Sequence, residues 1–177
     1  MATDRFSFFI PDPDYCDYLR QFDSRVPINS GDKSKRPFIG LVFQINDFQY
    51  YAGLASPKDK HSNMKNMADF IKINNGDWGV INLNNMIPVP QRLLTKVDFS
   101  LLSVVTAEDR HYKNLLQNQL SWCNEIKNKD FILEKAEKLY YSITNYESCF
   151  RNRCCDYILL EQECLKYCSI NKINLRD

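Results

Sequence analysis

Two β-prone runs separated by only two residues constrain the fold of this chain more than any other feature. Residues 38–45 and 48–54 are rich in the β-branched and aromatic side chains that strands favour. The Asn-Asp pair between them is a short polar connection of the kind that turns a chain back on itself. The sequence therefore predicts a β-hairpin. Because an antiparallel hairpin brings its two ends together, we expect residues 33–37 and 55–58 to be neighbours in space.

Shorter runs around this hairpin extend it into a larger sheet. Residues 14–25 interrupt them with apolar or aromatic side chains at helical spacings, which predicts an amphipathic helix that ends before Pro27. Proline and turn residues bound the other runs, as is usual for short strands. The first ninety residues are therefore expected to be mostly antiparallel sheet. The additional strands are predicted at residues 6–10, 70–73, 78–83 and 86–90.

The pattern changes to helical spacing after about residue 105. Apolar side chains at intervals of three and four predict helices over residues 112–126, 131–143 and 157–168. The predicted fold class is α+β: a strongly twisted antiparallel sheet, barrel-like in its core, covered by helices. A chain of 177 residues can bury about 70 % of its surface, so we expect one domain over 1–177. This domain is sheet-rich over 1–100 and helical over 105–177.

Several classes of protein lack support in this sequence. No apolar run approaches the ~20 residues of a membrane span, and the first residues are not those of a signal peptide. We therefore expect a cytoplasmic protein that does not enter a membrane. No P-loop, G-x-S-x-G elbow, H-E-x-x-H or G-x-G-x-x-G motif occurs. NTPases, hydrolases with a nucleophile elbow, zincins and Rossmann oxidoreductases are disfavoured as a result.

The seven cysteines suggest buried thiols rather than a metal centre. An odd number without a secretory context argues against a disulfide framework. Five of them crowd the last thirty residues, but no C-x-x-C pair occurs, and Cys164 and Cys168 lie four residues apart in a helical pattern. We therefore expect neither a metal site nor a cofactor, although zinc at the C-terminal cysteines stays the alternative.

Positive charge is local in this chain. The formal net charge is only +1, but the segment from Arg20 to Lys72 contains nine Lys and Arg residues and only five Asp residues. The predicted hairpin brings Lys35 and Arg36 close to Ser56 and Lys58, with Tyr15 as a further neighbour. Cations and hydroxyl groups without acids suit a phosphodiester, because the cations stabilise charge on its oxygens. An ordinary solvated basic surface, with a Ser-Pro pair that only turns the chain, is the open alternative.

Four short blocks of residues carry a resemblance to a known family. They are Tyr15-x-x-Tyr18-Leu19-x-x-Phe22-Asp23-x-x-Val26-Pro27, Phe38-Ile39-Gly40-x-Val42, Tyr51…Leu54-x-Ser56-Pro57-Lys58-x-x-His61 and Gly79-x-Ile81-Asn82-Leu83-x-x-Met86-Ile87-Pro88. In order and spacing they resemble the endoribonuclease toxins of type III toxin–antitoxin systems (the ToxN/AbiQ/CptN toxins). The resemblance covers about residues 6–90, and the helical half fits the layout of that family without a motif of its own.

The resemblance implies a sequence-specific, metal-independent endoribonuclease with a Kid/MazF-like fold. Such a toxin uses the 2′-hydroxyl of the RNA as nucleophile and leaves a 2′,3′-cyclic phosphate and a 5′-hydroxyl. It implies inhibition by a repeat-derived, pseudoknotted RNA antitoxin, which the toxin processes and binds in a closed protein–RNA assembly. Cellular or phage RNA is the implied substrate, and phage abortive infection or plasmid maintenance the implied role. Neither DNA nor a membrane is expected as a partner.

The resemblance also implies individual site residues. Ser56 and Lys58 match the Ser and Lys of the family's active-site turn, and Tyr15 matches a first-helix tyrosine associated with that site. Arg36 stands where the family often has a loop lysine. We therefore expect Ser56, Lys58, Arg36 and Tyr15 to be catalytic. The charge pattern places RNA contacts in a groove built from the basic loops, and the expected contacts are Lys33, Lys35, Lys60, His61, Lys65 and Lys72.

Two other functions stay open at this point. A non-catalytic RNA-binding module would use the same basic loops, with aromatic side chains such as Tyr15, Tyr50 and Tyr51 for stacking. A Kid/MazF-class toxin neutralised by a protein antitoxin would share the activity but not the RNA partner. The second histidine, His111, begins a predicted helix and is interpreted as a surface or packed residue.

Overall fold

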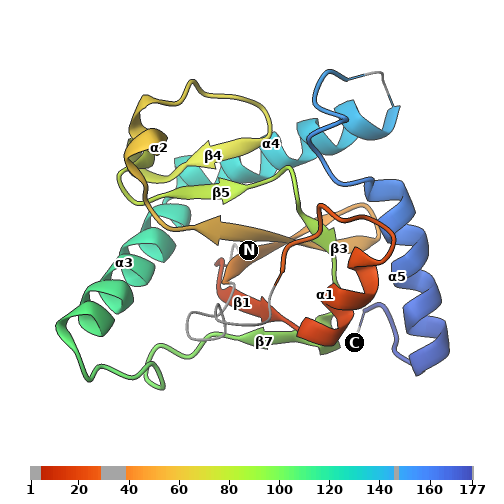
Figure 1. Ribbon diagram of the computed structural model, residues 1–177, viewed down its shortest axis with the longest axis horizontal. Helices are drawn as coiled ribbons and strands as arrows, with labels where there is room; N and C mark the ends of the chain where they lie inside the picture. The colour runs from red at the N-terminus through yellow and green to blue at the C-terminus, as the bar shows by residue number, and fades with distance from the viewer. Residues whose placement is uncertain (1–4, 29–38, 146–147, 177) are drawn as a thin grey trace.

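The computed structural model describes residues 5–28, 39–145 and 148–176 (Figure 1). Seven strands form a sheet in the order β4-β5-β3-β2-β1-β7, with β6 paired to β3, and every pairing is antiparallel. The sheet is open: β4 and β7 are its two edge strands and do not pair with each other within the described residues. The strands are β1 (Phe8–Pro11), β2 (Gly40–Ile45), β3 (Phe48–Ala55), β4 (Phe70–Lys72), β5 (Val80–Asn82), β6 (Ile87–Pro88) and β7 (Leu94–Lys96).

The predicted hairpin is confirmed as β2 and β3. Their register runs from Gly40 opposite Gly53 to Ile45 opposite Phe48. Asn46 turns the chain with φ 51°, a left-handed conformation that asparagine tolerates better than most residues. A further bond from Leu54 N to Ile39 O (2.8 Å) extends the ladder to the open end of the hairpin. The expected neighbours at residues 33–37 lie outside the described residues.

Strand β3 joins the two parts of the sheet. Its first six residues pair with β2, and two of these also pair with β6. Its last two residues, Leu54 and Ala55, pair with Ile81 and Val80 of β5. Strand β5 in turn pairs with β4. The end of β3 is therefore held between two ladders, and the residues that follow it start from a fixed position.

Helices pack around this sheet. Helix α4 contacts β4 through Lys135, whose Nζ donates to Phe70 O (2.7 Å), and Figure 1 shows α5 beside α1. One buried cluster contains side chains from the strands and from the helices, Leu41 and Leu160 among them. The prediction of one domain over 1–177 is supported by this shared core and stays a proposal. The helices are α1 (Pro13–Arg20), α2 (Asp59–Asn63), α3 (Ala107–Cys123), α4 (Ile126–Asn145) and α5 (Tyr157–Asn171), with two 3₁₀ turns, η2 (Ile73–Gly76) and η3 (Gln91–Leu93).

The α+β class and the helical C-terminal half are confirmed, with shifted boundaries. The first helix ends at Arg20 and not at residue 25, since Asp23 makes tertiary contacts instead of continuing the helix. Helix α3 starts five residues earlier than predicted because Thr106 and Asp109 form a capping box. Residues 59–63, for which no helix or strand was predicted, form the short helix α2. None of the described helices is long and apolar enough to cross a membrane.

Candidate active site

The turn Ser56-Pro57-Lys58 follows the end of β3 and exposes its side chains to solvent. The ladder between β3 and β5 ends at Ala55, and Pro57 has no N–H with which to extend it. Lys58 is extended (φ −139°, ψ 150°) and precedes the first residue of α2. The strand therefore delivers a hydroxyl and an ammonium group, two residues apart, to one exposed turn.

His61 fixes this turn from inside. Its side chain is only 4 % exposed, and its Nδ1 accepts a hydrogen bond from Lys58 N at 3.2 Å. The His61 backbone N donates to Lys58 O at 2.8 Å. Burial lowers the pKa of His61, and the nearby Lys60 and Lys58 lower it further. The neutral imidazole can accept the bond from Lys58 N. His61, which was expected to contact RNA, is therefore buried in the structure and holds the backbone of the turn.

Two glycines let the η2–β5 segment approach this turn closely. Gly79 has φ +94°, and a Cβ there would lie 2.0 Å from Ala55 O and 3.1 Å from Pro57 N. Gly76 has φ +101°, and a Cβ there would lie 2.8 Å from His61 O. Both positions need glycine, because other residues strain at positive φ and the space is occupied by backbone. The segment thus buttresses the turn and α2 directly.

An open pocket of about 450 Å³ adjoins the turn. Ser56 and Pro57 form one wall and the first half of α3 forms the other. Helix α3 is held in this place by Gln119, whose Nε2 donates to Trp78 O at 2.6 Å, next to the buttressing Gly79. Its lining residues are Ser56, Pro57, Ala107, Glu108, His111, Tyr112 and Leu115.

Two of the predicted RNA-binding lysines, Lys60 and Lys65, follow the predicted catalytic Lys58 along the chain. Lys58, Lys60 and Lys65 are exposed, and none has an acidic partner within the described residues. Lys72 is half-buried and its Nζ donates to Ser62 O at 3.0 Å. Lys72 also lines a groove of about 830 Å³ together with Lys135 and several asparagines, so cations continue from the turn across α2.

Of the other predicted site residues, Lys33, Lys35 and Arg36 lie outside the described residues. Tyr15 is fully buried, and its hydroxyl donates to Pro88 O at 2.7 Å. Its ring packs edge-on against Tyr167 of α5, with the centroids 4.9 Å apart. A side chain without exposed surface cannot contact RNA in this conformation, so the expectation of a catalytic Tyr15 is replaced by that of a core residue.

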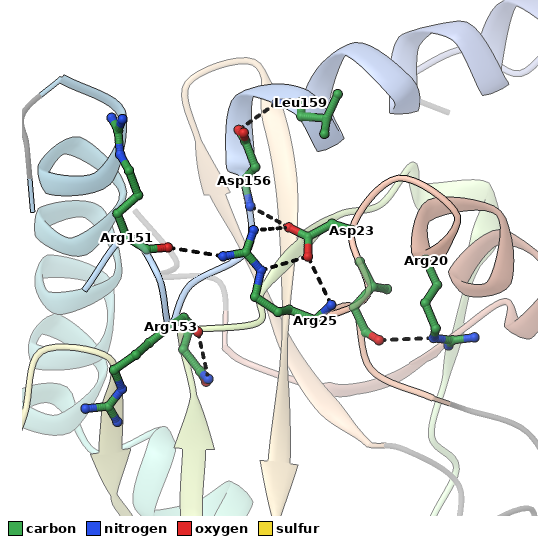
Figure 2. A network of polar contacts seen from close by, with 9 residues as sticks. Arg20, Asp23, Arg25, Arg151, Arg153, Asp156 and Leu159 are labelled. Atoms are coloured by element: carbon green, nitrogen blue, oxygen red, sulfur yellow. Dashed lines mark hydrogen bonds and ion pairs between the residues drawn. The ribbon is translucent and has the colours of Figure 1, made fainter. Parts of the chain in front are cut away.

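A second cluster of polar residues lies elsewhere and is internally satisfied (Figure 2). Asp23 Oδ1 accepts from Arg25 Nε and Asp23 Oδ2 from Arg25 Nη2, both at 2.8 Å, and Asp23 Oδ2 also accepts from Asp156 N at 2.8 Å. Arg25 Nη1 donates to Arg151 O at 3.1 Å. Burial raises the pKa of Asp23, but the hydrogen bonds from Arg25 and Asp156 outweigh it and lower the pKa overall. This network joins the loop after α1 to the start of α5.

The cysteines are free thiols, and most of them are buried in the described chain. All seven are free; Cys149 is exposed and the other six are buried. Burial raises the pKa of Cys16, Cys123 and Cys164 to about 12, which keeps these thiols protonated. Among the residues that the structure describes, no group of three or more His, Cys, Asp or Glu side chains could hold a metal ion.

Sequence reasoning missed four residues of this region. Gly76 and Gly79 could have been suspected, because glycine beside a short strand often marks close backbone approach. Glu108 and His111 gave no such signal. Periodicity shows that α3 packs on something, but only the tertiary structure shows that its first turns face Ser56.

These features define an α+β protein whose exposed turn is suited to the phosphates of a nucleic acid. A family model described as "Toxin ToxN, type III toxin-antitoxin system" matches residues 7–165. The chain belongs to this family, which confirms the resemblance seen in the sequence.

Individual relatives agree with this assignment. The chain is 32 % identical to endoribonuclease ToxN of Bacillus thuringiensis subsp. kurstaki, over 93 % of this chain and 85 % of the relative. It is 32 % identical to endoribonuclease ToxN of Pectobacterium atrosepticum (88 % and 90 % covered) and 28 % identical to endoribonuclease AbiQ of Lactococcus lactis subsp. lactis (90 % and 88 % covered).

Solved structures show the same fold. One concerns bacterial type III toxin–antitoxin systems and selective toxin inhibition by a non-coding RNA pseudoknot. It has a TM-score of 0.75 and 32 % identity, with 93 % of this chain and 98 % of that chain covered. Another concerns a processed non-coding RNA that regulates a bacterial antiviral system, with a TM-score of 0.74 and 25 % identity, over 90 % and 98 % of the chains.

Proposed function

We propose that this protein is a sequence-specific endoribonuclease toxin that is held inactive by an RNA antitoxin. The observation that carries the proposal is the Ser56-Pro57-Lys58 turn. Its side chains are exposed beside an open pocket, while its backbone is fixed by His61 and Gly79. Preorganised donors of this kind stabilise charge that develops in a transition state without further rearrangement. The endoribonuclease relatives over most of the chain support the same reaction.

The proposed reaction is a transesterification within the RNA. The 2′-hydroxyl oxygen attacks the adjacent phosphorus, the bond to the 5′-oxygen breaks, and the 2′-hydroxyl proton leaves as the 5′-oxygen gains one. The products are a 2′,3′-cyclic phosphate and a 5′-hydroxyl. Lys58 stabilises the charge on the non-bridging oxygens and Ser56 donates a hydrogen bond to the phosphate. Arg36 is proposed to add a second cation from its loop. These groups supply the positive charge themselves, so we propose that the reaction needs no metal.

The wider basic surface is proposed to bind the RNA. Lys60 and Lys65 are exposed in the segment that follows the turn, and Lys72 lines the larger groove. Lys33 and Lys35 are proposed to complete this surface. The antitoxin is proposed to be a repeat-derived, pseudoknotted RNA that the toxin processes and then keeps in a closed assembly. Cellular or phage RNA is the proposed substrate, in abortive infection or plasmid maintenance.

We also propose a domain organisation, a cellular location and a structural relationship for this protein. We propose that residues 1–177 form one domain, that the protein acts in the bacterial cytoplasm, and that its sheet is related to that of the Kid/MazF toxins. Superposition on Kid/MazF structures tests the last of these. A matching sheet order would support it, whereas matching helices without the sheet would contradict it.

The deciding experiment incubates the purified protein with a defined transcript in EDTA. We expect cuts at a few sites, with 2′,3′-cyclic phosphate ends, and no cuts by the Ser56→Ala variant. Lys127→Ala is the matched surface control, because Lys127 is exposed on α4 away from the turn. Cleavage that disappears in EDTA and returns with magnesium would contradict the metal-independent reaction.

The same preparation separates the other two functions. A shift of the RNA without cuts would indicate a binding module. A complex that absorbs near 260 nm indicates an RNA antitoxin, whereas neutralisation by a protein without nucleic acid would contradict the RNA partner.

A further inference from the structure

We propose that the pocket between the Ser56 turn and α3 receives the nucleobase next to the scissile phosphate, and that Glu108 selects a base with an exocyclic amino group. The inference rests on the proposed function and adds what that function leaves open, which is how the toxin chooses its cleavage site. It concerns side chains of α3 that no sequence motif indicated.

The pocket lies directly beside the proposed catalytic turn. Ser56 belongs both to the proposed catalytic turn and to the pocket wall, so a phosphate bound at the turn lies at the mouth of the pocket. A nucleobase is connected to its phosphate only through one sugar. The base adjacent to the reacting phosphate is therefore the part of the substrate that can reach the pocket.

The pocket is lined mainly by apolar and aromatic side chains. Its walls include the apolar surfaces of Pro57, Ala107 and Leu115 and the rings of His111 and Tyr112. RNA-binding proteins recognise single-stranded bases by stacking them on aromatic rings and binding their edges with polar groups. A cavity of about 450 Å³ falls in the range of sites that enclose a small ligand. These walls suit an aromatic base much better than a phosphate or a sugar.

Two polar side chains of the pocket can contact the edge of a bound base. Glu108 and His111 lie three residues apart on α3 and therefore on one face of the helix. Both are exposed, and neither has a hydrogen bond or an ion pair to another part of the described chain. An ionised carboxylate only accepts hydrogen bonds. Adenine, cytosine and guanine offer an amino group to it, whereas uracil offers two carbonyl oxygens and a single ring N–H.

The test is a map of cleavage sites on a transcript that contains all four bases in every context. We compare the wild type with Glu108→Gln and with Glu137→Gln, which makes the same chemical change on the exposed face of α4. For the wild type we expect uracil to be disfavoured at one position beside the cut. Glutamine adds an N–H donor that can pair with a carbonyl oxygen. Glu108→Gln should therefore reduce the discrimination against uracil at that position by about ten-fold, within the contribution of one base contact.

A second variant keeps the inference testable if Glu108→Gln folds poorly. His111→Ala removes a ring from the pocket wall and should lower kcat/KM about ten-fold at all sites, chiefly through KM, in line with the loss of one stacking contact. An unchanged site profile for Glu108→Gln together with an unchanged kcat/KM for His111→Ala would overturn this inference. The proposed function would stand if the wild type still cuts and the Ser56→Ala variant does not. No cleavage by the wild type would overturn both.

Discussion

Two polar regions of this protein differ in whether their side chains have hydrogen-bond partners within the protein. Around Asp23, the guanidinium of Arg25 and the backbone N–H of Asp156 occupy the carboxylate oxygens from within the protein (Figure 2). At the Ser56 turn, the backbone is held by His61 and Gly79, but the side chains of Ser56 and Lys58 point to no partner in the described chain.

The difference separates structural from functional polarity. A buried carboxylate is costly unless it is paired, so the Asp23 network saturates every oxygen and joins two distant segments. A site that must stabilise a phosphate needs the reverse: donors that are oriented by their backbone and left unoccupied until substrate arrives. The two regions should therefore respond to substitution in opposite ways, one in stability and the other in rate.

Lys58→Ala should show the largest effect among the variants that compare these two regions. Removal of one preorganised donor or charge from a transition state typically lowers the rate by about 10²–10³-fold. We expect this loss in single-turnover cleavage, with a free energy of unfolding within about 0.5 kcal/mol of the wild type, as for other surface substitutions. A stable variant that cleaves at the wild-type rate would remove Lys58 from the site.

Arg25→Ala should show the opposite behaviour. It leaves the buried Asp23 with fewer donors, which costs about 2–3 kcal/mol. Urea unfolding at pH 7 measures this loss, and the cleavage rate of the folded fraction should be unchanged. The lowered pKa of Asp23 means that its contribution is complete above the unfolded pKa of about 4 and is lost as the pH falls through the lower folded pKa. The difference between the wild type and the variant should therefore shrink in acid.

Tyr15→Phe tests whether Tyr15 contributes to the stability of the protein or to the rate of cleavage. The substitution leaves the buried Pro88 carbonyl without its partner at 2.7 Å, which should cost about 1–2 kcal/mol in urea unfolding. Since Tyr15 has no exposed surface, cleavage by the folded protein should stay within about two-fold of the wild type. A rate that fell 100-fold without loss of stability would restore the catalytic assignment of Tyr15.

These cases also show what the sequence could predict. The β2–β3 hairpin is local, since both strands and the turn lie within sixteen residues, and the pattern predicted it correctly. The exposed turn at its end followed from that hairpin and from Pro57. The burial of Tyr15 could not be predicted, because it depends on Tyr167 of α5, more than 150 residues away.

The second wall of the candidate site could not be predicted for the same reason. Helical spacing shows which face of α3 is apolar, but not that Gln119 binds Trp78 and so places His111 opposite Ser56. Likewise, the close approach of Gly76 to the His61 backbone requires the η2–β5 segment to fold back onto α2. Non-local packing decides these positions.

His61→Asn should change the pH dependence of cleavage. The pKa of His61 is lowered, so the neutral form that accepts from Lys58 N prevails above the unfolded pKa of about 6.5. As the pH falls below that value towards the lower folded pKa, protonation turns Nδ1 into a donor facing Lys58 and Lys60, and the turn loses this support. The Asn Oδ1 can accept the same bond without titrating. The ratio of variant to wild-type rates should therefore rise several-fold between pH 7 and pH 5, and a constant ratio would contradict this role.

Lys65→Ala should show the smallest effect, and it separates binding from chemistry within the basic region. Lys65 is exposed beyond the turn and has no acidic partner in the described chain, so it is free to neutralise one phosphate of bound RNA. Loss of one such contact reduces the slope of log Kd against log salt by about 0.7 on a single strand. The affinity for a non-cleavable RNA should fall a few-fold at low salt, with the rate of bound substrate unchanged. Lys127→Ala, away from the turn, should leave the slope as it is. A slower chemical step in Lys65→Ala would extend the catalytic region beyond the Ser56 turn.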